Sequence, residues 1–418
     1  MTDVRTRWGI WLDWALRFAF ACFCFSAPWS IAASQISLEF CSLFFVLVVI
    51  IKKYNPFTRP LRLFYWAVVV WWAWLLISGL ASPTPEHSLL ESRDEWLLII
   101  VAVGVYLMQD KRWMAIMVTV MASGMLLVSV QGFAQYFFGV DWLAAQTPEP
   151  APGFGYRVSG AYSGYVTFAG FFAVATVALT ALLTGSTKWL RPAQRWTLII
   201  AASIGGVLTV LTFGRIALVA MVGSLVLIAF LVGRRYRLWA VGLVIAALIA
   251  VVAIPGMRSW FQKSLTMEAE GWESSRLYIW QSSLDIIEDN PVVGVGVGHF
   301  REEYAARYSP TADQSKIVSH AHNDLLHFAA VLGIPGAVVY MGLWSVVLSY
   351  FIRGVRRNRD GASLAALAGS LCLLVISMFH GTFVDEEIRA LLMFLWAIGL
   401  TGWYNSRNSK PVPVELSA

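Results

Sequence analysis

Long apolar runs, separated by short polar segments, dominate this chain. A membrane-spanning helix needs about 20 mostly apolar residues, and runs of that kind recur from one end to the other. The strands of an outer-membrane barrel would instead alternate apolar and polar positions over about ten residues. The pattern therefore predicts an all-α integral membrane protein with about twelve transmembrane helices. We expect them at residues 11–31, 34–51, 61–81, 95–109, 113–138, 161–184, 196–213, 215–232, 238–255, 332–352, 361–380 and 387–406.

The polar loops between these runs support the count. When twelve spans are placed end to end, every cluster of basic residues falls on the same face of the membrane. The positive-inside rule assigns that face to the cytoplasm, so both termini are predicted to be cytoplasmic. The clusters are Arg5/Arg7, Lys52/Lys53/Arg59, Lys111/Arg112, Lys188/Arg191/Arg195, Arg234/Arg235/Arg237, Arg353/Arg356/Arg357/Arg359 and Arg407/Lys410.

The opposite face, predicted to be periplasmic, contains one long polar segment at residues 256–323. Within it, Ser274 and Ser275 are suited to cap a helix, and Asn290-Pro291 is suited to end it. The apolar positions between them recur at helical spacing, which is typical of an amphipathic helix on the outer membrane surface. These positions are Leu277, Trp280, Leu284 and Ile287.

Composition agrees with a membrane protein. Hydrophobic residues make up 58% of the 418 residues and charged residues only 13%, whereas soluble domains carry about 25% charged residues. The four cysteines all lie in apolar runs, so neither a disulfide framework nor a zinc site is indicated. Orientation alone explains the basic clusters, and no nucleic-acid partner is expected. The predicted parts are transmembrane helices 1–9 at residues 1–255, a periplasmic loop region at 256–323, transmembrane helices 10–12 at 324–410 and a cytoplasmic tail at 411–418.

Three of the six histidines, His320, His322 and His327, lie where the long polar segment meets a hydrophobic run. A titratable imidazole at a membrane boundary is an unusual placement. Asn323 is a good N-cap for a helix over residues 325–332, which would place His322 just outside a helix N-terminus that favours an anion. A neutral imidazole there can accept a proton from a hydroxyl while a phosphate leaves nearby. His322 is therefore the candidate general base, with His320 and Asn323 in supporting positions.

Other roles for these histidines stay open. A structural hydrogen bond is the alternative for His322, and we interpret His327 as structural. His320 and His322 are also spaced like a pair of metal ligands, but no third ligand is apparent, so no metal is expected.

Arginines on the predicted outer face form a second group of candidates, because no topological rule favours them there. Guanidinium groups match phosphate oxygens in a fork and stay charged at any working pH. Arg157, Arg215 and Arg276 would therefore suit a lipid-linked pyrophosphate. The alternative for Arg157 and Arg276 is an interfacial anchor or a salt bridge. Arg389 lies inside the last span and is expected to pair with Asp385, one helical turn earlier.

A glycine-rich segment, Gly294-Val-Gly-Val-Gly298, is similar to a nucleotide-binding fingerprint. It follows a predicted helix and Pro291 rather than a strand, and no βαβ unit is possible here. Nucleotide binding is therefore excluded, and we interpret the segment as a flexible loop that lets the backbone approach the membrane or a ligand.

Four motifs together resemble the O-antigen ligase and polymerase superfamily. The resemblance covers residues 157–340 by motif and the whole chain by topology. The motifs are Arg157-Val-Ser-Gly160, Arg276-Leu-Tyr-Ile-Trp280, Asn290-Pro-Val-Val-Gly-Val-Gly-Val-Gly-His-Phe300, and His322-Asn323 followed by Gly333-Ile-Pro-Gly336.

This resemblance implies a GT-C-like glycosyltransferase at the outer face of the inner membrane of a Gram-negative bacterium. Members of the superfamily use undecaprenyl-pyrophosphate-linked glycans as donors, and its ligases transfer O-antigen to lipid A–core without a nucleotide sugar, metal or cofactor. The essential histidine of the family falls on His322, and family arginines fall on Arg215, Arg276 and Arg157.

The predicted reaction is glycosyl transfer with inversion, with His322 as general base and the arginines neutralising the pyrophosphate that leaves. Three alternatives remain: a Wzy-type polymerase with a glycan acceptor, an O-oligosaccharyltransferase acting on protein Ser or Thr, and a non-enzymatic transporter of lipid-linked glycans. Transporters usually place charges at mid-membrane, whereas the polar residues here gather at one interface.

Overall fold

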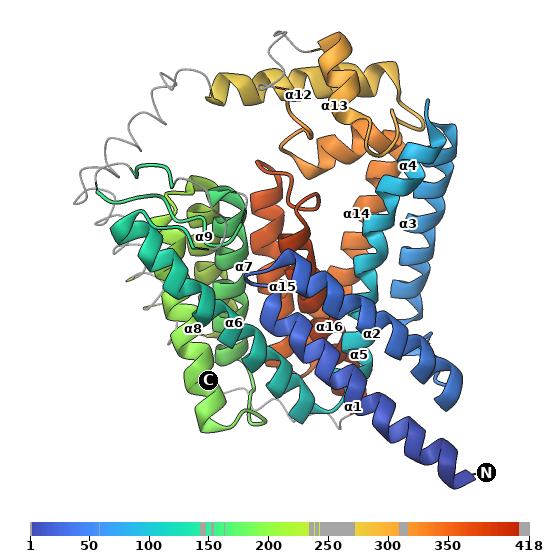
Figure 1. The fold of residues 1–418 in the computed structure, drawn as a ribbon, viewed down its shortest axis with the longest axis vertical. Coiled ribbons are helices and arrows are strands. Elements are labelled where there is room, and N and C mark those ends of the chain that lie inside the picture. Colours follow the sequence, from blue (N-terminus) through green and yellow to red (C-terminus); the bar gives the residue numbers. More distant parts are fainter. Residues whose placement is uncertain are drawn as a thin grey trace.

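The computed structural model is built from helices alone, with two isolated β-bridges, throughout the residues it describes (Figure 1). These are residues 2–57, 59–142, 148–151, 154–162, 164–233, 238, 242, 272–308 and 317–408. The all-α prediction is therefore confirmed for this part of the chain. The elements are α1 (Thr2–Ser26), α2 (Ile31–Lys52), η1 (Arg59–Leu61), α3 (Arg62–Ala81), α4 (Pro85–Glu91), η2 (Ser92–Leu98), α5 (Ile99–Met108), α6 (Lys111–Phe138), α7 (Tyr165–Thr184), α8 (Pro192–Leu211), α9 (Arg215–Val232), α12 (Trp272–Asp289), α13 (Phe300–Glu303), η3 (Tyr304–Tyr308), α14 (Asp324–Asn358), α15 (Gly361–Ser377) and α16 (Glu386–Asn408).

Eight helices in the described part of the chain are long and apolar enough to cross a membrane, namely α1, α2, α3, α6, α7, α8, α9 and α14. The predicted fourth span is different, because a 3-10 turn, η2, leads into an α5 of only 10 residues. The α15 helix has 17 residues, and α16 has 23 but begins with two glutamates. The predicted span at 238–255 and the tail at 411–418 fall outside the described residues apart from single positions. The number twelve remains a prediction.

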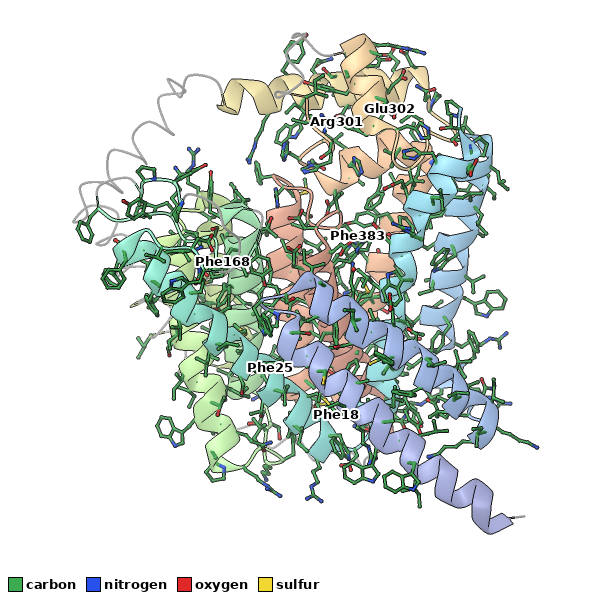
Figure 2. All side chains as sticks on the ribbon, viewed as in Figure 1. Phe18, Phe25, Phe168, Arg301, Glu302 and Phe383 are labelled. Carbon is green, nitrogen blue, oxygen red and sulfur yellow. The ribbon has the colours of Figure 1, made fainter. Side chains whose placement is uncertain are left out.

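The bundle is organised around α7, most of whose residues are buried. It packs against α8, α9, α15 and α16. Figure 2 shows the contrast between interior and surface: Phe168 of α7 and Phe383 are enclosed, whereas Phe18 and Phe25 project outward from α1. Arg301 lies at the α12–α13 end, beyond the apolar part of the bundle. An apolar exterior of this kind is what a helix bundle needs in order to face lipid.

Several of the basic loops meet at the end of the bundle opposite α12 and α13 (Figure 1). Ser186, between α7 and α8, donates its backbone N–H to the carbonyl of Arg359, between α14 and α15, at 3.3 Å. Asn405 of α16 donates to the carbonyl of Gln109 at 3.2 Å, and Lys52 pairs with a carboxylate of α1. These contacts agree with the expected gathering of basic residues on one face, and the cytoplasmic assignment of that face remains a prediction.

The α14 helix is broken at Gly333, whose φ of 74° and ψ of 175° are not helical. The break lies at the boundary that the sequence predicts between the helix at residues 325–332 and the span at residues 332–352. The loop after α12 pairs with the break: Ile334 donates its N–H to the carbonyl of Pro291 at 2.9 Å, and Val295 donates to Ala330 at 3.0 Å. The indole of Trp74 in α3 donates to the carbonyl of Leu332 at 2.9 Å. Backbone groups that the break releases are thus satisfied inside the protein, as membrane depth requires.

The glycine-rich segment forms part of this contact, and its interpretation as a flexible loop that approaches the membrane or a ligand stays a prediction. Gly294 has a φ of +69°, and a Cβ there would lie 2.3 Å from the carbonyl carbon of Val331. A Cβ on Gly333 would lie 2.2 Å from the carbonyl oxygen of Val292. The two backbones meet so closely that only glycine fits.

Replacing Gly333 with alanine is expected to lower the free energy of unfolding by about 2–4 kcal/mol, from backbone strain and steric overlap. The measurement is the thermal unfolding midpoint in detergent. Gly342→Ala is the matched control, because it lies in the same helix with open space around its Cα and alanine favours a helix. Equal midpoints for the two variants would contradict the role of the break.

The amphipathic helix expected after residue 273 is present as α12, and it ends immediately before Asn290 as predicted. Two details differ. The helix begins before Ser274, so Ser274 and Ser275 lie in its first turn rather than at its cap. Its buried face is formed by Ile279, Ser283 and Ile286, whereas Leu277 and Leu284 are 56% and 48% exposed. Helical periodicity located the helix, but the side of it that packs on the bundle was decided by neighbours distant in sequence.

Candidate functional site

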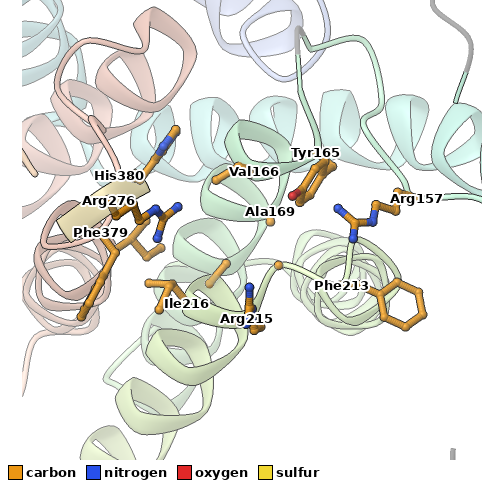
Figure 3. A pocket seen from close by; sticks show the side chains of 13 residues that line it. Arg157, Tyr165, Val166, Ala169, Phe213, Arg215, Ile216, Arg276, Phe379 and His380 are labelled. Carbon is orange, nitrogen blue, oxygen red and sulfur yellow. The ribbon is translucent and has the colours of Figure 1, made fainter. Parts of the chain in front are cut away.

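A cavity of about 270 Å³ brings together the three arginines selected from the sequence. Arg157 precedes α7, Arg215 begins α9 and Arg276 lies on α12. Figure 3 shows Arg157 and Arg276 extending into the cavity from opposite sides, with Arg215 on a third side. No acidic side chain is among the residues that line the cavity within the described ranges. Guanidinium groups from three separate elements therefore surround one space, an arrangement suited to a multiply charged anion.

The start of α9 adds to this positive environment. Phe213 adopts a left-handed conformation with a φ of 56°, and Gly214 is the N-cap residue. The hydroxyl of Thr212 accepts the N–H of Gly214 at 3.0 Å, which stabilises the turn. Gly214, Arg215 and Ile216 all line the cavity. A helix N-terminus favours negative charge because its first N–H groups lack partners within the helix.

The segment that follows Arg157 is held by a buried glutamine on α6. Gln135 accepts the backbone N–H groups of Ser159 and Gly160 at 3.1 and 2.7 Å, and its amide donates to the carbonyl of Gly160 at 2.8 Å. The Arg157 guanidinium lies 4.4 Å from the centre of the Tyr165 ring, in cation–π contact. It is also 3.5 Å from Glu149, whose side chain is mostly exposed. An exposed pair of this kind contributes little energy, so Arg157 stays available to an anion in the cavity.

The histidine in the wall of this cavity is His380, which the sequence analysis did not select. Its Nε2 lies 2.9 Å from the carboxylate of Asp385, and that carboxylate also accepts the hydroxyl of Thr167 at 2.8 Å. Burial alone would raise the pKa of Asp385, but the hydrogen bonds from His380 and Thr167 hold it below its usual value. The sequence signal that could have identified His380 is its position at the end of a predicted span, five residues before a carboxylate.

The His322 ring lies next to the His380 ring but does not itself line the cavity. The two imidazoles are stacked with centroids 6.2 Å apart, and the His320 ring contacts His322 at 4.2 Å. Burial is the main reason that the pKa of His322 falls to about 3, and the neighbouring imidazoles and the Arg276 guanidinium lower it further. The pKa of His320 falls to about 4, also chiefly through burial. Both rings are therefore neutral at physiological pH and able to accept a proton.

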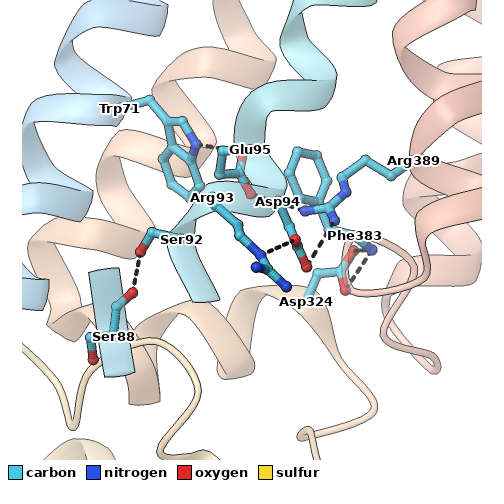
Figure 4. Close-up of polar contacts among 9 residues, drawn as sticks. All are labelled: Trp71, Ser88, Ser92, Arg93, Asp94, Glu95, Asp324, Phe383 and Arg389. Atoms are coloured by element: carbon cyan, nitrogen blue, oxygen red, sulfur yellow. Dashed lines mark hydrogen bonds and ion pairs between the residues drawn. The ribbon is translucent and has the colours of Figure 1, made fainter. Parts of the chain in front are cut away.

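The first residues of α14 hold this histidine group in place. Asn323 is the N-cap as predicted, since its side chain accepts the N–H of Leu326 at 3.0 Å, and its amide donates to the carbonyl of Met378 at 3.1 Å. The next residue, Asp324, accepts the hydroxyl of Thr382 at 2.7 Å. It also accepts the N–H of Phe383 at 3.1 Å (Figure 4). Both side chains thus bind the segment that carries His380. The position of His322 just outside a helix N-terminus is also confirmed.

The expected pairing of Arg389 with Asp385 is wrong. Arg389 donates instead to the buried carboxylate of Glu95 at 3.1 Å and lies 4.0 Å from Asp94 (Figure 4). Glu95 also accepts the indole N–H of Trp71 at 3.0 Å. The helical spacing allowed the local pair, but the buried carboxylate of Glu95 would be strongly destabilised without a cation, and Arg389 supplies it.

The arrangement as a whole can bind an anionic leaving group beside a neutral base. No group of three or more His, Cys, Asp or Glu side chains in the described part of the chain is arranged to hold a metal ion. The arginines can neutralise negative charge, and the imidazoles can transfer protons.

Comparison with known families matches residues 197–341 to a family model described as O-antigen ligase. This segment contains Arg215, Arg276 and His322, while Arg157 and His380 lie outside it. A search of curated proteins found no match. Members of the matched family are glycosyltransferase-like enzymes that act on lipid-linked glycans. The resemblance seen in the sequence motifs is confirmed: residues 197–341 are similar to an O-antigen ligase-type family, and the long apolar helices indicate a membrane protein.

Proposed function

We propose that this protein transfers a glycan from undecaprenyl pyrophosphate to lipid A–core at the periplasmic face of the bacterial inner membrane. The observation that carries the proposal is the single cavity lined by Arg157, Arg215 and Arg276 beside the neutral histidines. A pyrophosphate is an anion that such a cavity binds well. The description of the matched family, O-antigen ligase, is the reason for proposing a glycan as the group attached to this pyrophosphate.

In the proposed reaction an acceptor hydroxyl attacks the anomeric carbon of the donor sugar. Its proton passes to His322, the new C–O bond forms, and the bond from the anomeric carbon to the pyrophosphate oxygen breaks. The electron pair stays on the pyrophosphate, where the arginines neutralise it. A single displacement inverts the configuration of the anomeric carbon. By the family resemblance the proposed reaction uses no metal or cofactor. A pyrophosphate stabilised in this way leaves without a separate acid.

His380 and Asp385 have a positioning role in this proposal. Asp385 fixes the orientation of the His380 ring through the 2.9 Å contact, and that ring stacks on His322. The arrangement would keep the base aligned with the arginine cavity, in the way that carboxylates orient imidazoles elsewhere.

A Wzy-type polymerase would use the same residues with a glycan acceptor, and an O-oligosaccharyltransferase would use a protein hydroxyl. The test is reconstitution of the purified protein in proteoliposomes with undecaprenyl-pyrophosphate-linked glycan, with and without lipid A–core. Glycan attached to lipid A–core supports the ligase, and a lengthened lipid-linked glycan identifies a polymerase. Glycan transport that persists in His322→Ala would instead identify a transporter.

The pH dependence of kcat/KM gives a further expected result. Because the pKa of His322 is lowered to about 3, the base stays unprotonated as pH falls through 6.5, the ordinary histidine value. Between pH 8 and 5, kcat/KM should therefore show no loss from protonation of His322, since this parameter reports the free enzyme. An acid limb with a midpoint near 6.5 that persists in His380→Gln would contradict the assignment.

A further inference from the structure

A second cavity, of about 320 Å³, lies among α3, α4, η2, α13 and the first turns of α14, and it shares no lining residue with the arginine cavity. Its size falls in the range of about 300–1,000 Å³ that is typical of small-molecule sites. The residues used below are Glu91, Asp94, Glu95, Phe300, Arg301 and His327.

Four imidazoles lead from this second cavity to the arginine cavity. We call them the histidine row: His327, His320, His322 and His380. The ring centroid of His320 lies 6.4 Å from that of His327, 4.2 Å from that of His322 and 6.0 Å from that of His380. His327 lines the second cavity and His380 lines the arginine cavity. His320 therefore joins the two ends of the row, and the proposed base, His322, packs against His320 and His380 without lining either cavity.

The two cavities differ in charge. The arginine cavity has three guanidinium groups in its lining, whereas the second has the carboxylates of Glu91, Asp94 and Glu95 against the guanidinium groups of Arg301 and Arg389. An anionic pyrophosphate is therefore attracted to the first cavity and disfavoured in the second. A neutral ligand rich in hydroxyl groups has no such preference and can hydrogen-bond to carboxylates.

The lining of the second cavity combines aromatic and polar groups. Phe300 and Phe328 present rings, and Phe300 lies 5.3 Å from the ring of His327. Glu95 is already held by Trp71 and Arg389, whereas the exposed carboxylate of Glu91 makes no hydrogen bond or ion pair with other described residues. Apolar walls with a few convergent polar groups are characteristic of ligand sites, and sugar rings offer both an apolar face and hydroxyl groups.

From this geometry we infer that the second cavity binds a neutral sugar unit of the acceptor saccharide, while another sugar unit of the same saccharide presents the reacting hydroxyl to His322. The inference rests on the proposed glycosyl transfer. The donor pyrophosphate and this acceptor sugar unit then occupy two cavities that differ in charge, while the reacting hydroxyl of the acceptor meets the donor sugar beside His322.

The test is steady-state kinetics of the full-length protein in proteoliposomes, with lipid A–core and the lipid-linked glycan varied in turn. Glu91→Gln is expected to raise the KM for lipid A–core about tenfold, from the loss of one charged hydrogen bond, and to leave the KM for the donor within about twofold. Arg301→Gln, at another exposed position in the lining, is expected to act in the same direction. Glu86→Gln is the matched control, because Glu86 is an exposed glutamate of the same helix outside the cavity lining.

Unchanged acceptor KM in both variants, a raised donor KM instead, or an equal effect of Glu86→Gln would overturn the inference. Binding of core oligosaccharide, released from lipid A, to the unsubstituted protein and to Glu91→Gln provides a readout without turnover. Weaker binding to the variant supports the acceptor site even if the sugar-transfer chemistry proves different. Transfer to lipid A–core with an unaffected acceptor KM would leave the proposed function standing and reject this site alone.

Discussion

Replacing His322 with alanine is expected to lower the turnover of glycan transfer by about 10²–10⁴-fold, the usual contribution of a general base. The expected loss follows from its neutral imidazole, its position before the α14 N-terminus and its contact with the cavity-wall histidine. Donor binding should be retained, because the arginines that would hold the pyrophosphate are unchanged. The measurement is transfer to lipid A–core under single-turnover conditions, together with donor affinity.

A control is needed for the backbone strain that alanine would introduce at position 322. His322 has a φ of 51°, a left-handed conformation that asparagine tolerates better than alanine. His322→Asn should therefore preserve the local fold and still be inactive, which separates loss of the base from strain. His380→Ala and Asp385→Asn should cost less than His322→Asn, since both residues are proposed to position the base. If His380→Ala were inactive and His322→Asn active, the base would be His380.

Removing Arg215 is the second substitution with a large expected effect. Arg215→Ala should lower kcat/KM for the donor by about 10²–10³-fold, as is typical when one stabilising group for a developing anion is lost. Arg215→Lys should recover only part of this activity, because an ammonium group cannot form the guanidinium fork. The measurement is kcat and KM for the lipid-linked donor.

Arg195→Ala is the matched control for charge. Arg195 is an exposed arginine on α8, at the opposite end of the bundle from the cavity, and its removal should leave kcat/KM unchanged within about twofold. An equal loss in both variants would mean that net charge, rather than the cavity, determines activity. Full activity of Arg215→Ala would reject a role for this arginine in pyrophosphate binding.

The residue types of the site could be selected from the sequence because their chemistry is local. An arginine where no orientation rule favours one, and a histidine before a helix cap, are visible without a fold. Arg157, Arg215 and Arg276 were chosen in this way, and the structure brings them into one cavity. The Asn323 cap was also predictable, since a capping side chain bonds within its own first turn.

The partners of these residues could not be predicted in the same way. Arg389 has Asp385 one turn away, yet it pairs with Glu95, which is 294 positions distant in the chain. Asp385 in turn binds His380. Helical spacing shows which pairs can meet, but the desolvation of a buried charge decides which pair does, and desolvation depends on the whole fold.

Sequence alone therefore determined the helical class, most of the apolar spans and the chemical identity of the candidate base and cations, because these depend on periodicity and residue type. Only the tertiary structure decided that the glycine-rich segment packs on the break at Gly333, that His380 joins the arginine cavity and that a second cavity, lined by both carboxylates and arginines, lies at the other end of the histidine row. Those features arise from contacts between segments far apart in the chain, on which a local pattern places no constraint.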